Sequence, residues 1–129
     1  MSLGEVHRSW CRITYRMSKP LGEMSERRLL ALRRRLAAGV EDPALTLRGT
    51  LLSDMRRCSG EGCRCHRGEL HGPYTYLTVY SEGRSRMVYV PKGVADVAGR
   101  YVQVAQHNEA LLSEISHVNL ELLKRRVLR

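Results

Sequence analysis

The sequence contains no phenylalanine and only one tryptophan, so an apolar core must be built from leucine, valine, methionine and the six tyrosines. No apolar run approaches the roughly 20 residues that a membrane-spanning helix requires. The N-terminus also carries no apolar secretory segment. We therefore expect a cytoplasmic protein with no membrane partner. With 129 residues the chain suits a single domain, 1–129, with a modest core.

Catalytic signatures are absent as well. The sequence has no glycine-rich phosphate loop, no His-Glu-x-x-His motif and no Gly-x-Ser-x-Gly motif. It also lacks the deaminase arrangement, in which a glutamate follows a ligand histidine and Cys-x-x-Cys lies downstream. We therefore expect a protein that is not an enzyme. The weaker alternative is a metal-dependent nuclease or transferase that uses an acid such as Asp54 or Glu61.

Lysine is scarce, because 19 of the 22 basic residues are arginine, and with 13 acidic residues the net charge is +9. The planar guanidinium group matches the geometry of phosphate oxygens, so this composition favours a nucleic-acid partner, DNA or RNA. The alternative is a solvated basic surface in a protein from a GC-rich genome. The predicted phosphate contacts surround one cysteine-rich loop and the hairpin after it: Arg56, Arg57, Arg64, Arg67, Arg84 and Arg86.

Cysteine is rare, yet three of the four cysteines are crowded into one short loop. Cys58, Cys63 and Cys65 follow a Cys-x4-Cys-x-Cys spacing, and His71 lies shortly beyond them. Three thiolates and an imidazole are a donor set that Zn²⁺ takes at tetrahedral angles. The loop 58–71 therefore predicts a structural zinc site with these four residues as ligands.

Two other residues compete for a place in this site. His66 is the rival fourth ligand, although it adjoins Cys65, so both side chains would need a strained backbone to reach one ion. Cys11 is a reserve ligand, but its place on the apolar face of an alternating segment favours a buried core residue. The competing interpretations of the loop are three reduced thiols without metal and, less favoured, a disulfide.

Local patterns divide the chain into four parts. Alternating polarity predicts a strand over residues 10–18, and leucines at helical spacing predict an amphipathic helix over 25–38 with Ser25 as its N-cap. Residues 45–91 are expected to form strands around the zinc loop, and the region 94–126 a long helix. We expect an α+β fold in which a small, mostly antiparallel sheet with a zinc-pinned loop lies between an N-terminal amphipathic helix and a long C-terminal helix.

The firmest predicted strands form a hairpin after the zinc loop. Tyr74, Tyr76 and Tyr80 alternate onto one face of the first strand, opposite Leu77 and Val79. Exposed tyrosines at such a face can stack on nucleobases or simply pack against neighbouring strands. Before the zinc loop, a short helix over 51–55 is the alternative to a strand.

The long helix carries a heptad-like seam, which is typical of helix pairing. A polar residue, Asn108, occupies one core position of the seam, where it could fix the register of a homodimer by pairing with its twin. The alternative is that the seam packs on the chain's own sheet and first helix. The predicted dimerisation residues are Tyr101, Val104, Asn108, Leu111, Ile115, Val118 and Leu122.

Several short motifs connect the chain to a family. The sequence contains Gly49-Thr50-Leu51, the three loop cysteines, His71-Gly72-Pro73-Tyr74, Tyr89-Val90-Pro91 and Asn119-Leu120-Glu121-Leu122-Leu123. Over about Gly49 to Leu123 it resembles a group of small, functionally uncharacterised bacterial and archaeal proteins that are sometimes encoded near mobile elements. The family's Gly-Lys-Pro after the first cysteine is replaced here by Ser59-Gly60-Glu61. The resemblance implies the zinc site and no enzymatic activity.

Together these features predict a non-enzymatic, zinc-stabilised nucleic-acid-binding protein that serves as an accessory of a mobile element or defence system. The alternative is an adaptor subunit that binds itself or a protein partner through its long, coiled-coil-like helix.

Overall fold

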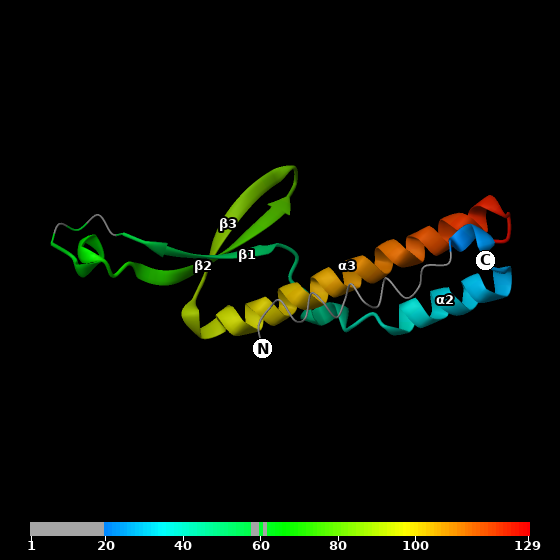
Figure 1. The fold of residues 1–129 in the computed structure, drawn as a ribbon, viewed down its shortest axis with the longest axis horizontal. Helices are drawn as coiled ribbons and strands as arrows, with labels where there is room; N and C mark the ends of the chain where they lie inside the picture. The colour runs from blue at the N-terminus through cyan, green and yellow to red at the C-terminus, as the bar shows by residue number, and fades with distance from the viewer. Residues whose placement is uncertain (1–19, 58–59, 61) are drawn as a thin grey trace. The chain divides into compact units, whose positions relative to one another are not determined.

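The computed structural model describes residues 20–57, 60 and 62–129. The predicted strand over 10–18, Cys11 and Cys58 lie outside these residues, as do the side chains of Cys65 and His66. The fold is α+β, as the sequence predicts, with a three-stranded antiparallel sheet, a short helix and a long C-terminal helix (Figure 1).

The chain divides into two compact units, and the long helix α3 (Ala95–Lys124) contributes to both. One unit is Gly39–Leu111, which contains the sheet and the N-terminal half of α3. The other contains the described residues 20–38 together with Leu112–Arg129. Among the described residues, no helix combines the length and the apolar character needed to cross a bilayer.

The sheet of the first unit has the order β1-β2-β3. Its strands are β1 (Thr50–Arg56), β2 (His71–Ser81) and β3 (Arg84–Val90). The alternative helix over 51–55 is therefore wrong, since these residues pair with β2 from Leu51↔Leu77 onward. The strand begins later than residue 45 because Asp42 caps a 3-10 turn over Pro43–Leu45, accepting a hydrogen bond from the Ala44 amide at 2.9 Å.

One face of the sheet covers the start of α3. Leu77, Val90 and Val102 are buried together, and partly buried apolar side chains surround them, including Leu51 and Ala98. Because side chains alternate between the faces of a strand, this packing leaves the residues between them on the opposite, outer face.

The second unit contains α2 (Glu26–Ala38), which lies beside the C-terminal half of α3 (Figure 1). Ser25 caps α2 as predicted, because its Oγ accepts a hydrogen bond from the Arg28 amide at 3.3 Å. The predicted leucine stripe of α2 is buried. Its counterpart on α3 is formed by Val118 and Leu122, which are fully buried.

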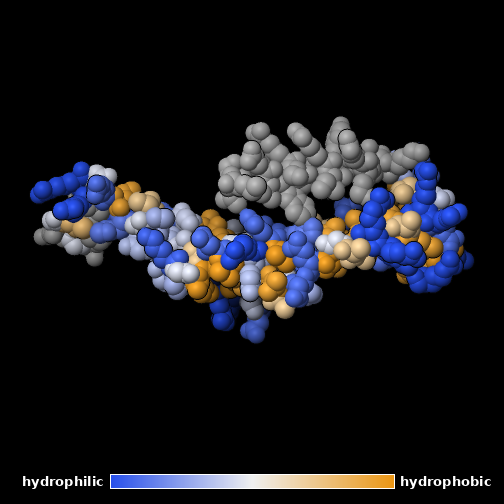
Figure 2. All heavy atoms as spheres, turned by 90° about the horizontal axis from the view of Figure 1, so that it is seen from below, coloured by the Kyte–Doolittle hydropathy of each residue, from blue (hydrophilic) through white to orange (hydrophobic). Residues whose placement is uncertain are grey.

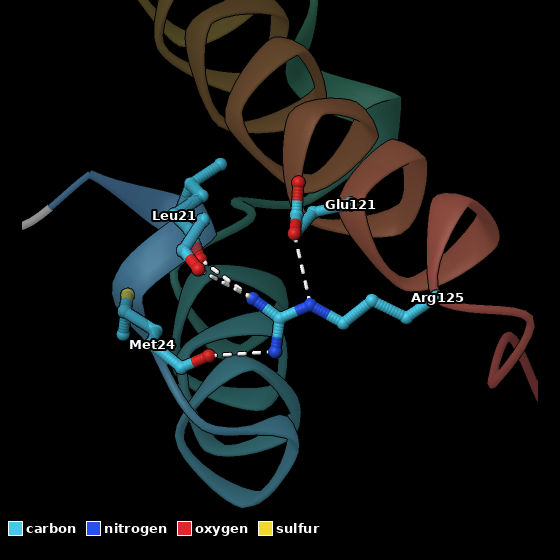
Figure 3. A network of polar contacts seen from close by, with 5 residues as sticks. Leu21, Met24, Glu121 and Arg125 are labelled. Carbon is cyan, nitrogen blue, oxygen red and sulfur yellow. Dashed lines mark hydrogen bonds and ion pairs between the residues drawn. The ribbon is translucent and has the colours of Figure 1, made fainter.

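Arg125 fastens the segment that leads into α2 to the end of α3 (Figure 3). Its Nε donates to Glu121 Oε1 at 2.8 Å, and its Nη1 donates to the Met24 carbonyl at 2.7 Å. Its Nη2 donates to the carbonyls of Leu21 and Gly22 at 3.1 and 3.2 Å. A single guanidinium group therefore satisfies backbone acceptors in a segment that has little regular structure of its own.

Candidate nucleic-acid interface and metal loop

The strand pairing of β1 and β2 brings the two ends of the cysteine loop together. Arg56 pairs with His71 at the base of the loop, after a register irregularity between Asp54 and Arg56. Gly72 has φ +126°, and a Cβ there would lie 2.8 Å from the Asp54 carbonyl oxygen. Only glycine fits this close approach without strain. The sheet thus sets the start and the end of the loop side by side.

Two of the four predicted zinc ligands meet within the loop. Cys63 Sγ lies 2.9 Å from His71 Nε2, and both residues are half-buried. Among the residues that the structure describes, no group of three candidate ligands gathers. Cys58 and the side chain of Cys65 belong to the part left undescribed. These two predicted ligands therefore lie at hydrogen-bonding distance from each other.

The predicted phosphate-contacting arginines are all exposed. Figure 2 shows strongly hydrophilic surface at the end of the cysteine loop (58–71), on the left of the view. Arg56 forms an ion pair with Asp54 at 3.1 Å. In the described part of the chain, the other five predicted arginines form no ion pair. Their charges are therefore available to an external anion.

The three predicted arginines that lie in strands, Arg56, Arg84 and Arg86, are divided between the two faces of the sheet. Arg86 pairs with Val79 and Arg84 with Ser81, so both share the face of Val79, which packs against the core. Arg56 lies on the outer face, where its guanidinium carbon is 4.8 Å from the centre of the Tyr76 ring. A single flat basic surface that includes all six predicted arginines is therefore not formed.

The sequence pattern of one protein family matches residues 23–99, which is more than half of the chain. The chain belongs to the DUF6788 family. That family is described as a domain of unknown function. No curated protein and no solved structure matches the chain.

The DUF6788 match includes α2, all three strands and the cysteine loop, and it ends near the start of α3. The candidate metal loop and the sheet therefore lie inside the family segment. Most of the helix with the predicted dimerisation seam lies beyond it.

The seam residues of α3 are partly used within the chain. Asn108 is only 7% exposed. Its Oδ1 accepts a hydrogen bond from the Glu41 amide at 2.8 Å, and its Nδ2 donates to the Glu41 carbonyl at 3.0 Å. Val118 and Leu122 are buried in the unit that contains α2. Tyr101, Val104, Leu111 and Ile115 are half-buried. At these positions the structure favours packing on the chain's own elements.

Tyr89 is a further candidate for stacking on nucleobases that the alternation of the strand residues did not single out. It pairs directly with Tyr76 across β2 and β3, and the two rings meet edge to face with centroids 5.7 Å apart. The sequence places Tyr89 in a predicted strand, but only the hairpin register shows which tyrosine lies opposite it. Tyr80, on the same face of β2, is largely exposed.

Proposed function

We propose that this DUF6788 protein is a non-enzymatic, zinc-stabilised nucleic-acid-binding protein. The observation that carries the proposal is a set of exposed arginines, Arg57, Arg64 and Arg67, in or next to a loop in which Cys63 and His71 meet at 2.9 Å. These three arginines have no carboxylate partner among the described residues. A phosphate backbone is the polyanion that such guanidinium groups match, and the net charge of +9 acts in the same direction.

Zn²⁺ would be held by Cys58, Cys63, Cys65 and His71. Four protein ligands leave no open position for water, so the ion would serve structure rather than catalysis. A rigid loop would hold Arg64 and Arg67 in place before binding and so lower the conformational entropy lost on association. Reduced thiolates suit the cytoplasm, which we propose as the location. Because the resembling proteins are sometimes encoded near mobile elements, an accessory role for such an element or for defence is part of the proposal.

The first experiment measures binding of labelled single- and double-stranded DNA and RNA across a salt series. Because each neutralised phosphate releases counterions, the logarithm of the binding constant should fall linearly with the logarithm of the salt concentration. In the Arg64→Glu/Arg67→Glu variant we expect weaker binding and a salt slope reduced by roughly 2, about 1 for each lost phosphate contact.

The matched control carries the same charge change on α2, as Arg27→Glu/Arg34→Glu. Both of these arginines are exposed and lie in the other unit. An equal loss in the two variants would show that binding follows net charge and not the loop. Absence of binding by the unaltered protein at low salt would overturn the proposal.

The metal is tested separately by the zinc content of purified variants. We expect stoichiometric zinc in the unaltered protein and loss of the metal in Cys63→Ser and His71→Ala, with zinc retained in His66→Ala and Cys11→Ser. Retention of zinc by both histidine variants would rule out the three-cysteine, one-histidine site.

A second candidate function, the protein-interaction adaptor, is favoured by one observation. Leu112, Leu120 and Leu123 are about half exposed along the C-terminal half of α3. This apolar surface, rather than the occupied Asn108 position, is the one available to a second helix or to a protein partner. An adaptor would lose self-association or partner binding in Leu112→Asp/Leu123→Asp and would be indifferent to the arginine reversals on the loop.

A further inference from the structure

The outer face of the sheet carries an apolar and aromatic surface that the core does not explain. Leu52, Tyr76 and Tyr89 pair in register across the three strands, so their side chains share one face. The neighbouring row on that face includes Met87. Leu52 is 53% exposed, Tyr89 52% and Met87 60%. The buried Leu77 belongs to the opposite face, so these residues do not contribute to its cluster.

This surface includes one cationic side chain, that of Arg56. The Arg56 guanidinium lies over the Tyr76 ring at 4.8 Å, within the range of a cation–π contact. Tyr76 also meets the edge of Tyr89, at an interplanar angle of 63°. Both contacts restrict the rotamers of Arg56 and Tyr76. Arg56, Tyr76 and Tyr89 therefore form a row on the outer face: the planar guanidinium group of Arg56 lies over the Tyr76 ring, and the half-exposed Tyr89 ring lies beside it.

The positive charge of Arg56 indicates which kind of partner can bind to this row of side chains. Arg56 donates its Nε to Asp54, the carboxylate on this face of β1. Within the described residues, its Nη1 and Nη2 donate no further hydrogen bond. Arg57 follows directly and is exposed. A partner with planar apolar groups and a negative backbone therefore fits the surface better than an apolar protein helix, which would leave the guanidinium group unmatched.

Single-stranded nucleic acid has both properties. Its bases can turn their faces outward and stack on aromatic rings or on guanidinium planes, while the phosphates meet cationic groups. A duplex cannot offer these faces, because its bases are already stacked on one another. The geometry therefore separates the two kinds of nucleic acid.

We propose that the outer sheet face is a base-stacking platform for single-stranded DNA or RNA, with one base on the Tyr89 ring and another on the Arg56 guanidinium plane. Tyr76 is a positioning residue that supports the guanidinium group from below. This inference rests on the proposed nucleic-acid binding and names its substrate class as single strands.

The deciding variants keep charge or apolar character and remove only planarity. Arg56→Lys retains the positive charge but loses the planar surface, and Tyr89→Leu retains an apolar side chain but loses the ring. In each we expect about tenfold weaker binding to a single-stranded oligonucleotide. We expect an unchanged salt slope and unchanged duplex binding. Leu52→Thr, on the same face but without a ring to lose, is the matched control and should bind like the unaltered protein.

A second measurement needs no variant. An oligonucleotide with 2-aminopurine should lose fluorescence when the unaltered protein binds, because stacking quenches this base. Binding without quenching, or an equal loss of duplex and single-strand binding in Arg56→Lys, would overturn the platform while leaving nucleic-acid binding intact. A loss in Leu52→Thr equal to that in Tyr89→Leu would also overturn it and would indicate an apolar docking surface. No binding of any nucleic acid would instead overturn the proposed function and the platform with it.

Discussion

Asn108 shows how one side chain can join segments far apart in the sequence. Its amide both accepts from and donates to the backbone of Glu41, so the residues before β1 are fixed to α3 by two hydrogen bonds. His107, the preceding residue, adds a contact of 2.7 Å between its Nε2 and the Gly39 carbonyl oxygen. A polar residue in an apolar seam thus has a partner within its own chain.

Replacing Asn108 by leucine should lower the free energy of unfolding by about 1–2 kcal/mol, because the Glu41 amide and carbonyl would lose two part-buried hydrogen bonds to the Asn108 side chain. Urea denaturation measures this change. Gln106→Leu, which alters an exposed amide on the same helix, should change stability by less than about 0.5 kcal/mol.

Sedimentation of the same Asn108→Leu variant examines the dimer interpretation. If Asn108 pairs with its twin, leucine should change the oligomeric state. If it serves Glu41 alone, the mass in solution should stay the same while stability falls. Equal stability of Asn108→Leu and the unaltered protein would contradict the intrachain role.

The two helical segments of the unit that contains α2 depend on their ends as well as on their leucines. Ser25 begins α2 with a side-chain cap, and Arg125 holds the approach to that cap through the carbonyls of Leu21, Gly22 and Met24. The Arg125–Glu121 ion pair is mostly buried, with side chains 27% and 19% exposed. It therefore stabilises more than a pair in open solvent would.

The Arg125→Met variant should lower the free energy of unfolding by about 2–3 kcal/mol, because hydrogen bonds to a charged donor are lost and the backbone acceptors are left to water. Arg125→Lys should not restore it, since an ammonium group cannot reach several carbonyls in the same fork. Thermal unfolding measures both. Arg126→Met removes the same charge from an exposed neighbour and should be nearly neutral; a loss as large as that of Arg125→Met would show that charge alone matters.

Whole-molecule behaviour follows from the division into two units. All four predicted zinc ligands lie within Gly39–Leu111, whereas the α2 unit contains none of them. If the metal pins the loop, its removal should loosen the unit that contains the sheet before it affects the other.

Hydrogen exchange with and without a chelator measures this. We expect lower protection at the loop ends of β1 and β2 and unchanged protection over residues 26–38 and 112–124, reversed by added zinc, because local unfolding releases only the segment that the metal constrains. Cys63→Ser should already exchange like the metal-depleted protein and should not respond to chelator. A uniform loss across the chain, or no change at all, would contradict a structural metal confined to this unit.

Local sequence patterns were enough to predict the features that depend on near neighbours: the capped, leucine-striped helix, the tyrosine-rich hairpin and the long helix. These are set by backbone preferences and side-chain periodicity over a few turns or strand residues. Three further features became visible only in the folded chain: Asn108 hydrogen-bonds to Glu41, Tyr89 packs against Tyr76, and Arg56 lies on a different face of the sheet from Arg84 and Arg86. These outcomes depend on strand register and on contacts between segments distant in the sequence, which no local pattern specifies.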